Sequence, residues 1–299
     1  MEVFIEPQAG TNSVTNLIRE AEKYLNLNYY LIDDDEMLKA ISERVEKKVN
    51  VRIIIDGHPY DSGGHIDLER LRQTGAQVNI SPSRFDNEDV FDHAKYMYNE
   101  KRYIIGTMNL TKAAFQSNRE YFIVGDERKV LKSLERIFES DWKGERAGDT
   151  DRKYLIVSPD SENRILAILT DSRKLFIETE ELGNDKAILS ALRSKGGKVR
   201  LILPSSVSES DLANAVELDK AGVKIKLMAS EKLYMHAKMI DTGKFVFIGS
   251  QNFSDTSLLK NREVGIRIYK YGLKKIFKNT FKEDWKNASH ITRSQRKEK

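Results

Sequence analysis

This 299-residue chain contains an internal duplication. His93 and His236 lie 143 positions apart, and the same offset relates several other identical residues without a gap. The matching stretches are His93-Ala94-Lys95 with His236-Ala237-Lys238, Gly106 with Gly249, Asn109 with Asn252, Asn118-Arg119-Glu120 with Asn261-Arg262-Glu263, and Asp141-Trp142-Lys143 with Asp284-Trp285-Lys286. Chance does not produce such a run, so the chain is expected to contain two copies of one structural unit.

Each copy alternates short β-branched strands with amphipathic helices. Upstream of the motifs the offset drifts, yet VNVRIIID at 49–56 still resembles KVRLILP at 198–204. The alternation predicts an α/β fold in which each half is a mixed β-sheet flanked by helices. The polar stretch 144–153 is the best candidate linker, so we expect an N-terminal half at 1–148, a C-terminal half at 149–290 and a basic tail at 291–299.

A closing helix is expected at the end of each half, because apolar residues there recur at helical spacing and would form one buried face. These residues are Val130, Leu134, Ile137, Phe138 and Trp142 in the first half, and Leu273, Ile276, Phe277 and Trp285 in the second.

Composition narrows the class of protein. A hydrophobic content of 39% is enough for a sizeable core, and the absence of cysteine excludes disulfides, thiolate metal sites and a cysteine nucleophile. No apolar run is long enough to span a membrane, and the N-terminus does not look like a signal peptide. We therefore expect a cytoplasmic protein without stable membrane insertion. The formal charge of +4 permits a phosphate-rich partner without requiring one.

The chemistry is carried by the two His-x-Lys motifs. In HAKYMYNEKRYIIG and HAKMIDTGKFVFIG, apolar residues surround a polar turn, which predicts a β-hairpin in each half. Residues two apart on a strand share a face, so each motif would present an imidazole beside an ammonium group. A single His-x-Lys would usually be an ordinary surface pair. Its recurrence with the downstream Asn and Glu residues makes a functional site the better interpretation.

The remaining histidines support no second site. His58 and His65 lie in a Gly-rich loop without counterparts in the other half, and a zinc site would need further ligands at suitable spacing. We interpret both as loop residues and expect neither a metal nor a cofactor.

The motif H-x-K, followed by G-[ST]-x-N and then an acidic residue, resembles the signature of the phospholipase D superfamily. The first copy has His93, Lys95, Thr107, Asn109 and Glu120, and the second has His236, Lys238, Ser250, Asn252 and Glu263. The resemblance extends over almost the whole chain. The family's aspartate five positions after the lysine is replaced by Glu100 in the first copy, and in the second the nearest acid, Asp241, comes two positions early.

The resemblance implies two similar halves packed with pseudo-twofold symmetry around one active site. It implies that one histidine attacks phosphorus to form a phosphohistidine and the other acts as acid and then base. By analogy with most of the family, His93 is assigned as the nucleophile and His236 as the acid. The lysines and asparagines would hold the phosphate oxygens, Glu120 and Glu263 would orient the histidines, and Thr107 and Ser250 would contact the phosphate or support residues that do.

The substrate is less constrained than the chemistry. The leading hypothesis is a metal-independent nuclease acting on DNA or RNA, although the acidic stretch DNEDVFD at 86–92 would repel a polyanion. The alternative is phospholipid chemistry, either phospholipase D hydrolysis or a cardiolipin-synthase-like phosphatidyl transfer. A third hypothesis is a catalytically silent nucleic-acid-binding protein. Both a monomer and a homodimer remain open.

Overall fold

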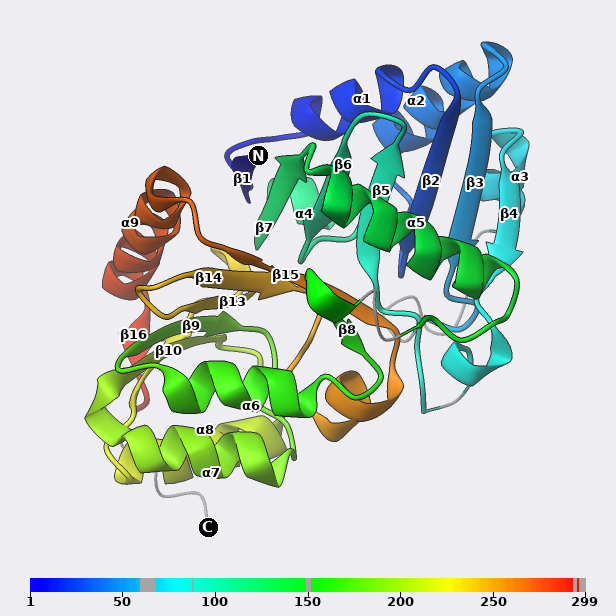
Figure 1. The fold of residues 1–299 in the computed structure, drawn as a ribbon. Helices are drawn as coiled ribbons and strands as arrows, with labels where there is room; N and C mark the ends of the chain where they lie inside the picture. The colour runs from blue at the N-terminus through cyan, green and yellow to red at the C-terminus, as the bar shows by residue number, and fades with distance from the viewer. Residues whose placement is uncertain (60–67, 88, 149–151, 293–294, 296–299) are drawn as a thin grey trace.

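The computed structural model describes residues 1–59, 68–87, 89–148, 152–292 and 295 (Figure 1). In the first half the elements are β1 (Glu2–Glu6), α1 (Asn12–Arg19), β2 (Tyr24–Tyr29), α2 (Asp35–Glu46), β3 (Asn50–Ile55), α3 (Leu68–Gln73), β4 (Gln77–Ile80), β5 (Lys95–Asn99), β6 (Tyr103–Gly106), α4 (Lys112–Gln116), β7 (Asn118–Gly125) and α5 (Arg128–Trp142).

The second half repeats this plan. Its elements are β8 (Leu155–Ser158), α6 (Glu162–Asp171), β9 (Leu175–Thr179), α7 (Lys186–Lys195), β10 (Val199–Pro204), α8 (Glu209–Lys220), β11 (Lys224–Met228), β12 (Tyr234–Met235), β13 (Lys238–Asp241), β14 (Val246–Gly249), β15 (Glu263–Ile268), α9 (Tyr271–Asn287) and β16 (Ser289–His290). His65 and part of the expected linker lie outside the described residues.

The two halves have matching sheets. The first sheet has the order β1-β7-β6-β5-β2-β3-β4, and the second has the order β16-β11-β10-β9-β13-β14-β15-β8. In each, a set of parallel strands, β2-β3-β4 or β9-β10-β11, continues into antiparallel strands that include the motif hairpin. The predicted α/β fold with two mixed, helix-flanked sheets is confirmed, as are the hairpins β5-β6 and β13-β14.

Three layers of apolar side chains hold the sheets and helices together. Helices α1 and α2 pack on the outer face of the first sheet, and α6, α7 and α8 pack on the outer face of the second. The central layer lies between the two halves and contains residues of α5 and α9. This shared core makes the two halves one structural unit.

The closing helices bury the faces that the sequence predicts, with one exception. Leu134 and Phe138 of α5 are fully buried, as is Phe277 of α9. Ile276, which we expected on the buried face of α9, is instead 40% exposed. The buried stripe continues from Phe277 to Phe281, four residues on, and Ile276 falls outside it.

Arginine–aspartate pairs connect the two halves reciprocally. Arg119 of the first half forms two hydrogen bonds to Asp284 of the second, at 2.7 and 2.9 Å. Arg262 of the second half donates to Asp141 of the first at 2.8 Å. All four side chains are buried. The 143-residue offset relates the two pairs, so the repeated Arg and Asp residues are partners across the interface.

The backbone repeats the same exchange. Met235, just before the second motif, pairs with Arg119 of β7, and Asp92, just before the first motif, pairs with Arg262. The amide of His93 donates to the carbonyl oxygen of Arg262 at 2.9 Å. The residue just before each motif histidine therefore pairs with a backbone segment of the opposite half.

Removing one member of a buried pair should destabilise the whole protein. We expect Asp284→Ala to lower the free energy of unfolding by about 3 to 5 kcal/mol, because it leaves the Arg119 guanidinium buried without its carboxylate. Glu43→Ala removes the partner of Arg19 in a partly exposed ion pair. This substitution should change the free energy of unfolding by no more than about 1 kcal/mol. Urea denaturation followed by circular dichroism measures both, and equal effects would contradict this role of the interface pair.

Candidate active site

Two lysines mark the starts of matching strands. Lys95 is the first residue of β5 and Lys238 the first of β13, and both are buried. Each ammonium donates to the carbonyl oxygen of its own motif histidine, at 2.9 Å for Lys95 and 2.7 Å for Lys238. His93 and His236 themselves lie just before the strands, where the chain bridges to the other half. The expectation that the motif histidines lie on regular strands is therefore wrong.

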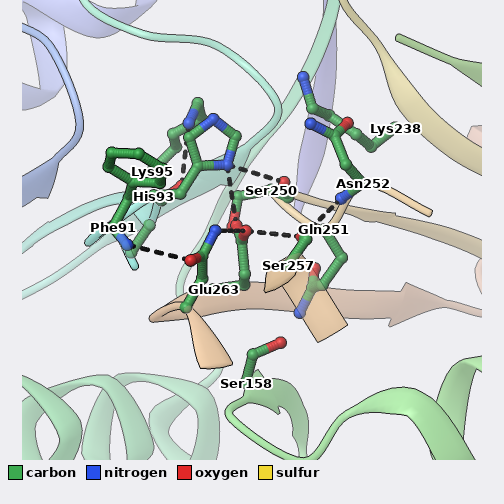
Figure 2. Close-up of polar contacts among 12 residues, drawn as sticks. Phe91, His93, Lys95, Ser158, Lys238, Ser250, Gln251, Asn252, Ser257 and Glu263 are labelled. Carbon is green, nitrogen blue, oxygen red and sulfur yellow. Dashed lines mark hydrogen bonds and ion pairs between the residues drawn. The ribbon is translucent and has the colours of Figure 1, made fainter. Parts of the chain in front are cut away.

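Each histidine is paired with a glutamate of the opposite half. Nδ1 of His93 lies 3.0 Å from a carboxylate oxygen of Glu263 and 3.2 Å from the carbonyl oxygen of Ser250 (Figure 2). Nδ1 of His236 lies 2.6 Å from a carboxylate oxygen of Glu120. Each ring therefore has its Nδ1 atom next to a carboxylate of the opposite half, which leaves Nε2 on the other side of the ring.

Both glutamates are buried and held by further polar groups. Ser257 and Asn261 donate to one carboxylate oxygen of Glu263, at 2.7 and 3.2 Å, while its other oxygen faces His93 (Figure 2). Glu120 accepts from the Thr107 hydroxyl and from the Asn118 side chain. Ser257 has no counterpart among the residues predicted from the sequence, because its position is not part of the repeated pattern.

Thr107 and Ser250 are fully buried beside these carboxylates. The hydroxyl of Thr107 donates to Glu120 and accepts a hydrogen bond from the amide of Tyr121. The hydroxyl of Ser250 accepts a hydrogen bond from the amide of Val264. These contacts correspond to a supporting role, and direct contact with a substrate stays a prediction.

The two asparagines supply unused polar atoms. Asn109 and Asn252 are 6% and 5% exposed, and the side-chain oxygen of each has no hydrogen-bond partner among the described residues. A buried polar atom without a partner is costly unless a ligand satisfies it. Both asparagines are therefore suited to binding a polar ligand.

Glu180 is a site residue that the sequence analysis missed. Its carboxylate lies 2.6 Å from the ammonium of Lys238 and 3.4 Å from Nε2 of His236. It follows the last residue of β9, Thr179, which pairs with Lys238. In the first half the same register places Tyr30 after Tyr29, which pairs with Lys95. The strand register thus identifies Glu180, although the 143-residue offset does not.

Tyr30 gives the first half a different environment. Its ring packs against the His93 ring, with centroids 4.9 Å apart, and the Lys95 ammonium lies 5.2 Å from its centroid. Within the described part of the chain, His93 forms an ion pair with one carboxylate, Glu263, whereas His236 forms ion pairs with two, Glu120 and Glu180. The two motifs are alike in sequence and unlike in charge.

Burial and neighbouring charges shift the ionisation of the first motif. Burial, and then the charge of Lys238, lowers the pKa of Lys95 to about 7. Burial and the charge of Lys95 also lower the pKa of His93, although Glu263 opposes this. A lowered histidine pKa favours the neutral imidazole, the form that acts as a nucleophile.

The carboxylates of the second motif stay ionised. Burial alone would raise the pKa of Glu120, but the nearby His236 and Lys238 hold it below the usual range. Burial likewise opposes ionisation of Glu180, and the neighbouring His236 and Lys238 side chains hold its pKa well below the usual range. Burial and the charge of Glu180, in contrast, raise the pKa of the neighbouring Glu181 to about 7.

A cleft of about 400 Å³ is lined by His93 and Asn252, and Glu180, Glu181 and Asp89 make part of its lining acidic. Together with Lys95, Lys238, Asn109 and His236, these residues provide donors that can hold a tetrahedral oxyanion and nitrogens suited to nucleophilic and acid–base chemistry.

Other predicted features lie outside this site. His58 is exposed and its Nδ1 lies 2.9 Å from Asp86, so it is a loop residue as expected. Glu100 accepts from the amides of Glu22 and Lys23, a structural contact. Within the described ranges no group of three or more histidines and acidic residues is arranged to hold a metal ion. No helix among the described residues is long and apolar enough to cross a membrane.

A phosphodiester-cleaving or phosphodiester-transferring enzyme of the two-histidine type is the class that this fold and site define. Sequence comparison is consistent with that class. The family model described as "Cardiolipin synthase, PLD-like domain" matches residues 14–142 and 171–285, which include both motifs. The chain therefore belongs to the phospholipase D superfamily, within this cardiolipin-synthase-like family.

Individual relatives cover nearly the whole chain. A cardiolipin synthase of Clostridium perfringens is 25% identical over 92% of this chain and 68% of its own length. Phosphatidylserine synthase from Haemophilus influenzae has a similar structure, with a TM-score of 0.72, 12% identity, and coverage of 97% of this chain and 87% of that one. Polyphosphate kinase from Porphyromonas gingivalis gives a TM-score of 0.73 at 13% identity, and the 98% of this chain that matches spans about half, 49%, of that longer protein. The structural likenesses show a shared fold.

Glu180 should compete with an oxyanion for Lys238. We expect Glu180→Gln to bind inorganic phosphate about tenfold more tightly than the wild type, roughly 1.4 kcal/mol, because a negative charge beside the binding cation is removed. Isothermal titration calorimetry measures the affinity. Glu181→Gln is the control, since Glu181 lines the same cleft but makes no ion pair with Lys238 or His236 among the described contacts, and should change the affinity less. Unchanged or weaker binding by the Glu180 variant would show that its carboxylate does not compete.

Proposed function

We propose that this protein is a phosphatidyl transferase of the cardiolipin-synthase type, which moves the phosphatidyl group of a phospholipid to an alcohol acceptor. The observation that carries the proposal is the pair of His–Lys–Asn–Glu sets, each completed by a glutamate of the opposite half. The Clostridium perfringens relative reported above is named a cardiolipin synthase, as is the matching family model, which supports phospholipid as the substrate class.

The first step forms a covalent intermediate. Nε2 of neutral His93 attacks phosphorus, a P–N bond forms, and the P–O bond to the leaving alcohol breaks. Protonated His236 gives its proton to the leaving oxygen, and an imidazolium at this position is ion-paired with Glu120 and Glu180. The lysines and asparagines stabilise the charge that develops on the non-bridging oxygens.

The second step reverses the first with a new alcohol. The hydroxyl of the acceptor gives its proton to His236, now neutral, and its oxygen attacks phosphorus as the P–N bond to His93 breaks. When the donor and acceptor are both phosphatidylglycerol, the products are cardiolipin and glycerol. Water in place of the alcohol gives phospholipase D hydrolysis, so both forms of the phospholipid hypothesis share one mechanism.

The acidic lining of the cleft favours phospholipid over nucleic acid. Glu180, Glu181 and Asp89 lie on the same cleft as His93, where they would repel the flanking phosphates of a polynucleotide. A phospholipid brings one phosphodiester, and its hydroxylated headgroup can donate hydrogen bonds to carboxylates. The nuclease hypothesis drawn from the sequence is therefore replaced here by its phospholipid alternative. The complete and buried catalytic sets likewise count against a silent nucleic-acid-binding protein.

The direct test is phosphatidyl transfer. We expect the wild type, in excess EDTA, to convert phosphatidylglycerol to cardiolipin and glycerol, and His93→Ala and His236→Ala each to lower the rate at least about 1000-fold. Mass spectrometry of the lipid products measures this. Labelled DNA and RNA are incubated in parallel, and cleavage of either by the wild type, lost in both variants and accompanied by no lipid turnover, would replace the proposal with a nuclease.

The lowered lysine pKa makes a specific prediction about pH. With a pKa of about 7, Lys95 carries its charge below pH 7 and loses it as the pH rises through 7, so kcat/KM should fall on the alkaline side from about pH 7. Lys95→Arg keeps its charge at high pH and should move this limb upward by more than one pH unit, even if the maximal rate falls. The pH profile of kcat/KM measures the shift. If the alkaline limb of the profile does not move, it belongs to a group other than Lys95.

A further inference from the structure

The outer surface of α9 carries a row of lysines. Tyr271, Lys275, Lys278, Lys282 and Lys286 are all exposed, and their spacing of three or four residues aligns them along one side of the helix. We call these five residues the lysine face. The opposite side of α9 is buried in the core shared by the two halves.

The duplication supplies an internal comparison for this surface. At the 143-residue offset, the lysine face corresponds in α5 to Arg128, Lys132, Glu135, Glu139 and Lys143. The α5 lysines are balanced by the two glutamates, whereas all four matching positions of α9 are lysines. Both helices bury equivalent aromatic residues in the same core. The fold therefore does not require the accumulated charge of α9.

The two glutamates of α5 each contact a residue of the first sheet. Glu139 pairs with Arg52 of β3, and Glu135 accepts a hydrogen bond from Tyr24. The strand register places Arg200 of β10 in the position of Arg52. Arg200 is exposed and lies over the rings of Phe176 and Trp285. Arg200 thus adds to the positive charge on this side of the second half.

Exposed apolar groups lie at the start of the same helix. Tyr269 and Tyr271 are 63% and 79% exposed, and Ile276 is 40% exposed. The matching positions in the first half are Asp126, Arg128 and Ser133. Both the charges and the apolar groups of α9 thus differ from those of α5.

We propose that the lysine face, together with Tyr269, docks on the surface of a bilayer that contains anionic phospholipid. A row of lysines is attracted to anionic headgroups, and exposed tyrosines are favoured at the boundary between headgroups and acyl chains. Lysines alone would also attract a polynucleotide, but Tyr271, which is 79% exposed on the same side of the helix, is favoured at the boundary between headgroups and acyl chains. The inference rests on the proposed function, in which the substrate is a membrane lipid.

A series of contacts joins α9 to the active site. Asp284, on the buried side of α9, holds Arg119 through two hydrogen bonds. The next residue, Glu120, contacts His236. Docking through α9 therefore places the catalytic centre at a fixed position relative to the membrane.

Vesicle binding with matched variants tests the docking. Wild type should bind vesicles of equimolar phosphatidylglycerol and phosphatidylcholine and should bind pure phosphatidylcholine far more weakly. The variant K275Q/K278Q/K282Q should lose affinity for the anionic vesicles by on the order of 100-fold. The control K129Q/K132Q/K143Q removes the same charge from or beside α5, at exposed positions, and should lose no more than a few-fold. Co-sedimentation measures all three.

The same affinity in the α9 variant and the wild type, or an equal loss in the control, would overturn the proposal. The proposal would also be overturned if the wild type did not bind anionic vesicles and instead bound single-stranded DNA through the same lysines. Turnover of short-chain phosphatidylglycerol below its micellar concentration separates this inference from the proposed reaction. Both lysine variants should retain wild-type rates there. Vesicle docking by a wild type that cannot turn over this monomeric lipid would support the docking surface while refuting the reaction.

Discussion

The structure depends on a reciprocal exchange between its two halves. The segment Asn118-Arg119-Glu120 reaches into the second half, where its arginine binds Asp284 and its glutamate faces His236. The segment Asn261-Arg262-Glu263 does the same to Asp141 and His93. Adjacent residues of one strand thus join the halves and orient the catalytic rings. The interface and the active site are built from the same strands, so a change in one is transmitted to the other.

Much of this arrangement follows from the sequence. A repeat at a constant offset requires two similar units, and β-branched strands alternating with amphipathic helices require an α/β fold. The motif residues could be chosen because His, Lys, Asn and Glu recur together. The offset does not say whether Glu120 serves its own motif histidine or the other one. Only the packing of the two halves decides that, because the answer depends on contacts about 100 residues or more apart in the chain.

Three features of the structure could not be predicted from the sequence repeat, each for a physical reason. Glu180 lies upstream of the second motif, where the constant offset is lost, and its role follows from the pairing of β9 with β13. The histidines leave the regular strand because their neighbours Asp92 and Met235 bridge to the other half. Spacing alone places Ile276 in the buried stripe of α9, but in the structure the stripe runs through Phe277 and Phe281. Periodicity identifies a helix more reliably than it identifies the edge of its buried face.

The pairing of each motif histidine with a glutamate of the other half also has an evolutionary consequence. A chain containing one such half could complete its site only by associating with a second, identical chain, and every mutation would then appear on both sides of the site. Fusion of two copies into one polypeptide removes that constraint. Tyr30 and Glu180 occupy the same place in the two halves and have opposite chemical character, a difference that a symmetric pair of identical chains could not maintain. In this protein, the presence of both copies in one polypeptide allows the two sides of the site to differ.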